Sequence, residues 1–136
     1  MRICLFVSGL LCLGLVSGCS GDNRLNVKGR LLKSGAPLKL QDPDFVRVIF
    51  FPVTTNGRPP ANTYLAAVDD AEGTFEAVGP DGRGVPPGKY RIAIELNRKR
   101  KDALKGAFDG DRSPFVFDID AGTPELVIDL DKPPAK

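Results

Sequence analysis

Histidine and tryptophan are both absent from this 136-residue sequence, and its single methionine is Met1. Without histidine, a Ser-His-Asp triad, a Cys-His nucleophilic pair and a histidine-ligated metal site are excluded. Copper or haem handling is disfavoured for the same reason, because such sites draw on His and Met ligands. The composition therefore removes the commonest catalytic and metal chemistries.

Neither sign of charge dominates, because 19 basic side chains nearly balance 17 acidic ones and leave a net charge of +2. No polyanionic partner is implied at the level of the whole chain.

Cysteine is scarce as well, and all three thiols lie in the first 19 residues, at Cys4, Cys12 and Cys19. Fifteen glycines and twelve prolines favour many short elements joined by turns.

The first residues have the pattern of a secretory signal peptide. Arg2 precedes an apolar run from Ile3 to Val16. At 1.5 Å per residue such a run reaches only about 21 Å as a helix, which is short of a hydrocarbon core of about 30 Å. A charged start followed by a short apolar run is typical of a signal peptide. An uncleaved membrane anchor is the alternative.

The end of that run, Val16-Ser17-Gly18-Cys19, resembles the lipobox of bacterial lipoproteins. The resemblance implies cleavage after residue 18 and acylation of Cys19 by diacylglycerol and fatty acids such as palmitate. Two or three acyl chains would then hold the protein on the membrane. Ser20 stands where Asp would resemble an inner-membrane retention signal, so an exported protein at the outer membrane is favoured over one at the inner membrane.

The rest of the chain divides into a tether over 19–24, one domain over 25–131 and a Pro-rich tail over 132–136. Loss of residues 1–18 would remove Cys4 and Cys12, and Cys19 would carry lipid. No thiol is then left for disulfides or zinc, so we expect the domain to rest on its hydrophobic core alone.

Period-2 alternation runs through the domain and is clearest over 89–96, where every second side chain from Tyr90 to Leu96 is apolar. An all-β fold follows, with seven short strands joined by turns. We expect these strands at 25–31, 45–53, 64–68, 74–78, 89–96, 115–120 and 125–131. This spacing predicts a seven-stranded antiparallel β-sandwich of Ig-like type, with an up-and-down barrel as the alternative. Residues 97–113 are irregular, with a single helical turn expected at 103–106.

Three phrases carry a family resemblance, and they occur in a fixed order. They are Val27-Lys28-Gly29-Arg30-Leu31, Asp70-Ala71-Glu72-Gly73-Thr74-Phe75 and Val85-Pro86-Pro87-Gly88-Lys89-Tyr90. Together they resemble the carboxypeptidase-regulatory-like, transthyretin-like domains. With the lipobox, the chain is similar to small lipoproteins of planctomycetes. The resemblance implies a seven-stranded sandwich and brings no catalytic residue with it.

The strand at 45–53 is apolar on both faces. Val46, Val48 and Phe50 alternate without interruption and are expected in the core. Ile49 and Phe51 then lie on the outer face. We expect residues 97–113 to cover them through Leu104 and Phe108, or else an exposed apolar patch that binds a partner.

The run Arg98-Lys99-Arg100-Lys101 is the strongest local charge feature. A solvated loop is the plain interpretation. Contact with anionic lipid head groups, lipopolysaccharide or a wall polymer is the functional one. Nucleic acid is not expected, because the protein is exported and the run has no interleaved aromatic residues.

The acidic clusters are expected in turns or on solvated strand faces rather than at metal or catalytic sites. Asp69, Asp70 and Glu72 lack the spacing of a calcium loop, and Asp109-Gly110-Asp111 is typical of a surface turn.

The sequence thus predicts a protein that is not an enzyme and uses no cofactor. It predicts a structural or protein-binding module of the cell envelope, with a carbohydrate or envelope-polymer module as the alternative. The expected interaction residues are Ile49, Phe51, Arg98, Lys99, Arg100 and Lys101.

Overall fold

A computed structural model describes residues 23–56 and 62–134 of the chain. Every regular element in these residues is a strand. The ten strands are β1 (Val27–Lys33), β2 (Ala36–Pro37), β3 (Phe45–Pro52), β4 (Tyr64–Leu65), β5 (Ala67–Asp69), β6 (Thr74–Ala77), β7 (Gly88–Arg98), β8 (Lys101–Asp102), β9 (Val116–Ile119) and β10 (Leu126–Asp129). Seven strands were expected, and three of the ten (β2, β4 and β8) are only two residues long.

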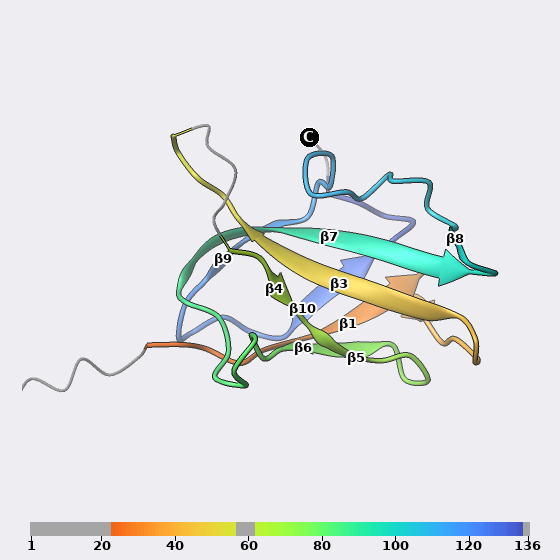
Figure 1. The fold of residues 1–136 in the computed structure, drawn as a ribbon, viewed down its shortest axis with the longest axis horizontal. Coiled ribbons are helices and arrows are strands. Elements are labelled where there is room, and N and C mark those ends of the chain that lie inside the picture. Colours follow the sequence, from red (N-terminus) through yellow and green to blue (C-terminus); the bar gives the residue numbers. More distant parts are fainter. Residues whose placement is uncertain (1–22, 57–61, 135–136) are drawn as a thin grey trace, which may run out of the picture.

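The strands form two sheets, as Figure 1 shows. The first sheet has the order β10-β1-β6-β5, with β2 also paired to β1. The second has the order β4-β3-β7-β8, with β9 also paired to β7. The all-β prediction is confirmed, and two separate sheets are the arrangement of a sandwich rather than of one closed cylinder.

One strand pair departs from the antiparallel prediction, because β1 and β10 run parallel from Gly29 opposite Leu126 to Leu32 opposite Asp129. The path of the chain explains this direction. β9 belongs to the second sheet and ends at Ile119, at the same end of the molecule where β1 begins (Figure 1). The chain enters β10 from that end after a short turn, so β10 must run in the same direction as β1.

The core lies between the two sheets and comes from the alternating apolar positions. Leu31 and Ile128 contribute from the first sheet, and Phe50 and Ile92 from the second; all four are fully buried. The ring of Phe50 meets the ring of Phe75 edge-on, with centroids 6.2 Å apart, which joins the two sheets by an aromatic contact. The expected core facing of Val46, Val48 and Phe50 is confirmed.

Two glycines were singled out by the sequence, and each has a packing reason. Gly29 lies in the middle of β1 with its Cα against the ring of Phe75, so a Cβ there would overlap the ring. Gly73 has a φ of +71° and closes the turn between β5 and β6. β5 and β6 therefore form an antiparallel hairpin around residues 70–73.

The two ends of the sandwich are far apart and differ in what they carry (Figure 1). The segment that leads into β1 lies at one end of the long axis (Figure 1). The turn between β7 and β8 lies at the other end, beyond the arrowhead of β7. No helix long and apolar enough to cross a membrane occurs in residues 23–56 and 62–134.

Candidate functional site

The basic run forms a tight β-hairpin rather than a loose loop. Arg98 at the end of β7 pairs with Lys101 at the start of β8, which leaves Lys99 and Arg100 as a two-residue turn. Both turn residues have positive φ, 51° for Lys99 and 65° for Arg100. Positive φ at both central positions is the geometry of a type I′ turn, the turn that matches the twist of a hairpin.

The four cations of this hairpin are all exposed. Only Arg98 makes an ion pair, with Nε 3.4 Å from an Oδ2 atom of Asp44. Within the described residues, Lys99, Arg100 and Lys101 have no acidic partner at ion-pair distance. The tip therefore presents uncompensated positive charge to solvent.

The carboxylate of Asp102 stabilises the hairpin by accepting three backbone hydrogen bonds. Its Oδ1 atom accepts hydrogen bonds from the backbone N–H of Leu96 at 3.1 Å and of Leu104 at 3.0 Å, and its Oδ2 atom accepts one from Gly106 at 2.7 Å. One half-buried carboxylate thus ties β7 to the segment that follows β8. Sequence reasoning missed this residue, although an Asp directly after the basic run and four residues before a glycine is a signal for a side-chain-capped turn.

Residues after β8 continue to cover the edge of β7. The backbone N–H of Ile94 donates to the carbonyl oxygen of Phe108 at 2.9 Å, and that of Ile92 donates to Phe115 at 2.8 Å. The buried hydroxyl of Ser113 donates to the carbonyl oxygen of Ile92. The segment is built from turns, and the helical turn expected at 103–106 is absent because Lys105 and Gly106 both have positive φ.

Ile49 and Phe51 lie half-buried on the outer face of the second sheet, as expected. The segment 97–113 covers Phe51 with its backbone: a Cβ at Gly110 would lie 3.0 Å from the Phe51 ring. Leu65, which is paired with Ile49, stays 54% exposed, so an apolar strip remains partly open on this face. Val116 on β9 is 39% exposed, but Arg91 separates it from Phe51 in the sheet.

The expected contacts of Leu104 and Phe108 with the outer face need correction. Phe108 is buried in the core cluster, with its ring centroid 5.3 Å from that of Phe115, and Leu104 packs against the same cluster. These side chains close the edge of the sandwich between the sheets. Phe108 also lines the small hollow beside Ile49 and Phe51.

The apolar strip and the basic hairpin do not meet. Ile49 is paired with Ala93, and Arg98 follows five residues later on β7. At about 3.3 Å per residue this separates them by about 17 Å along the strand. Arg47 lies between them and pairs with Glu95 at 3.3 Å. The six residues expected to form one interaction surface therefore form two separate features.

The acidic clusters take part in turns and strand edges. Asp69 accepts from the backbone N–H of Ala71 at 3.0 Å and of Glu72 at 3.1 Å. Asp70 accepts from the N–H of Val46 at 2.8 Å and so caps the free edge of β3. Within residues 23–56 and 62–134, no three His, Cys, Asp or Glu side chains gather in a way that suits a metal ion.

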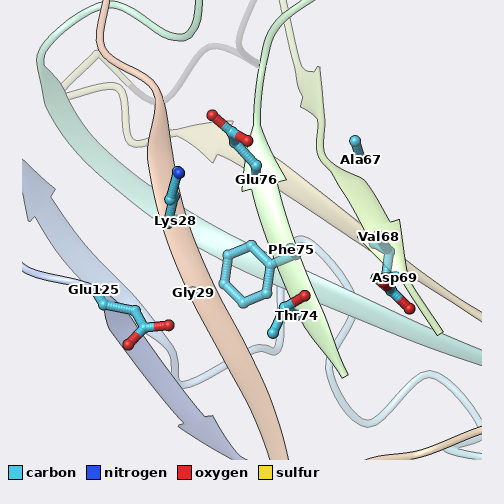
Figure 2. A pocket seen from close by; sticks show the side chains of 9 residues that line it. All are labelled: Lys28, Gly29, Ala67, Val68, Asp69, Thr74, Phe75, Glu76 and Glu125. Carbon is cyan, nitrogen blue, oxygen red and sulfur yellow. The ribbon is translucent and has the colours of Figure 1, made fainter. Parts of the chain in front are cut away.

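A shallow hollow of about 470 Å³ lies on the first sheet over β1, β5 and β6 (Figure 2). Figure 2 shows the carboxylate of Glu76 on β6 and that of Glu125 just before β10, on opposite sides of β1, with Lys28 between them. Asp69 at its rim is engaged by the turn described above. The hollow is open to solvent, and its charged groups do not converge on one point.

Cys19, the expected lipidation site, lies outside the described residues. No protein-family model, no curated protein and no solved structure matches the chain.

Proposed function

We propose that the protein is a lipoprotein of the bacterial cell envelope, with residues 1–18 as signal peptide, an acyl anchor on Cys19 and a non-enzymatic binding domain. The sequence Val16-Ser17-Gly18-Cys19 at the end of a short apolar run is the single observation that carries this proposal. The outer membrane is the favoured location because Ser20 follows the cysteine. The anchor holds the domain by a tether that joins β1 through residues 19–24.

The domain is proposed to be a transthyretin-like or carboxypeptidase-regulatory-like sandwich. Support comes from the two sheets that the strands of residues 23–56 and 62–134 form, and from the turn phrases that lead into β6 and β7. Two features suggest what it binds. The apolar strip of Ile49 and Leu65 suits a protein partner, whereas the basic hairpin suits an envelope polymer.

The anchor is tested by expression of the full chain in a bacterial host, beside the variant Cys19→Ser. The wild type is expected in the detergent-soluble membrane fraction with an acyl mass on the peptide that begins at residue 19. Cys19→Ser is expected to leave that fraction. Identical partition of the two proteins, without acyl mass on the wild type, would contradict the proposal. Cys12→Ser serves as the matched control, because its thiol lies within the proposed signal peptide.

A further inference from the structure

We propose that the β7–β8 hairpin binds an anionic polysaccharide of the cell envelope, through charge contacts made by Arg98, Lys99, Arg100 and Lys101. The inference deepens the proposed function and rests on it, since export is what brings the domain to such a polymer. The hairpin then serves as the outward end of a tethered binding module.

The density of charge on the tip is the first support. A hairpin pair brings the Cα atoms of Arg98 and Lys101 to about 5 Å of each other, with Lys99 and Arg100 directly beyond them. The four cations therefore lie close together at the tip of the hairpin. Only Arg98 has an acidic neighbour, Asp44, and the carboxylate of Asp102 behind the turn is occupied by three backbone N–H groups.

The backbone of the turn is the second support. A type I′ turn favours Asn-Gly, since both central residues need positive φ. Here the two positions hold Lys99 and Arg100, whose Cβ atoms make that conformation strained. Residues held in strained backbone conformations cluster at functional sites. The two strained positions of this turn both hold cations.

The size of the tip indicates the chemistry of the ligand. A stable protein interface buries about 800 Å² on each partner, which a two-residue turn does not supply. None of the four side chains at 98–101 is aromatic, so the tip offers no ring that could stack on a sugar face. A flexible chain with repeated carboxylate or phosphate groups fits them, because it binds through successive charge contacts.

The direction of the hairpin favours a polymer over the anchoring membrane. β7 has eleven residues, so it extends about 33 Å from Gly88 to Arg98. The segment that leads into β1, where the tether joins the domain, lies at the opposite end of the long axis (Figure 1). The cations therefore face away from the lipid that holds the tether, toward the polymers beyond the membrane surface.

The test measures binding of the full chain, purified in neutral detergent, to immobilised polygalacturonate, with neutral dextran as the control polymer. The variant Lys99→Asn with Arg100→Gly keeps a type I′ turn and removes two charges. The matched control, Lys28→Gln with Lys89→Gln, removes two exposed charges away from the hairpin. At about 50 mM salt the hairpin variant is expected to bind about tenfold more weakly, and the control within about twofold of wild type.

Binding to polygalacturonate but not dextran, lost in the hairpin variant and in about 1 M salt, supports the proposal. Equal binding by wild type and hairpin variant overturns it. Stronger hairpin-dependent binding to phosphatidylglycerol vesicles than to the polymer also overturns it, in favour of a membrane contact. The Cys19→Ser protein is expected to bind the polymer like wild type, so failure of the anchor and failure of the hairpin are separate results.

Discussion

The hydroxyl of Tyr90 donates a hydrogen bond of 2.7 Å to the carbonyl oxygen of Pro86, four residues earlier in the chain. This bond ties the proline turn to the start of the longest strand. The same ring is buried to 3% exposure and meets the rings of Phe50 and Tyr64 edge-on. A single side chain thus fixes both the entry of β7 and one end of the core.

Tyr90 makes stability sensitive to alkaline pH. Burial, and secondarily the neighbouring phenol of Tyr64, raises the pKa of Tyr90 to about 12. An unfolded tyrosine titrates near 10, so between about pH 10 and 12 the unfolded chain loses a proton that the folded chain keeps. This contribution to the free energy of unfolding is fully present below pH 10 and is lost as pH rises through 12, up to about 2–3 kcal/mol.

The variant Tyr90→Phe is expected to remove that alkaline loss. At neutral pH it loses the hydrogen bond to Pro86 and about 1 kcal/mol of stability. Urea unfolding at pH 7 and at pH 11 measures both effects. If the wild type and the variant lost the same free energy of unfolding above pH 10, the alkaline sensitivity would belong to a group other than Tyr90.

The type I′ turn predicts that removal of its cations stabilises the domain. Lys99→Asn with Arg100→Gly relieves two strained left-handed residues, each of which costs about 1–2 kcal/mol. The extra backbone freedom of glycine in the unfolded chain offsets part of this gain, so we expect a net rise of about 1 kcal/mol. Calorimetry should give a midpoint about 4–8 °C higher. Alanine at both positions removes the charge but keeps the strain, and an equal rise there would refute the explanation.

We expect Asp102 to contribute more to the stability of the domain than an exposed turn carboxylate does. Asp102→Ala leaves the backbone N–H groups of Leu96, Leu104 and Gly106 without their acceptor. We expect a loss of about 1–3 kcal/mol and faster hydrogen exchange at these three amides. Asp109→Ala, which removes an exposed carboxylate from the same segment, is the matched control. Unchanged exchange at Leu104 and Gly106 would show that the segment holds its shape without the carboxylate.

Phe50 and Phe51 are neighbours in sequence and opposite in environment. Phe50→Ala removes a ring that is fully buried between the sheets, and we expect a loss of about 3–5 kcal/mol. Phe51→Ser removes a half-buried ring under Gly110, with an expected loss of about 1 kcal/mol. Chemical denaturation compares the two. Equal and large losses would mean that the outer face is packed as tightly as the core.

Alternation along the chain allowed the strands and their buried faces to be predicted, because a period of two maps directly onto the two sides of a sheet. The burial of Val46, Val48 and Phe50 in the core was therefore predicted correctly. The direction of β10 was not accessible in this way. It depends on which end of the sandwich the chain has reached after β9, and no local pattern encodes that position.

The hairpin was missed for a different reason. Turn prediction relies on residues that adopt positive φ easily, and Lys99 with Arg100 is the opposite of such a pair. Phe108 was placed on the outer face because its contacts come from a segment without periodicity. Its burial against Phe115 follows from the backbone bond between Ile94 and residue 108, which is a tertiary contact.

The parallel neighbours β1 and β10 also determine how the domain would respond to a pulling force. A load applied between the segment that leads into β1 and the hairpin tip runs along the strands, whose ladder bonds lie across that direction. β1 is held by β6 on one side and β10 on the other, so the bonds of both ladders must break together in shear. With the membrane anchor at one end and a polymer bound at the other, as proposed above, the domain would resist extension, because its strand hydrogen bonds would have to break together rather than one after another.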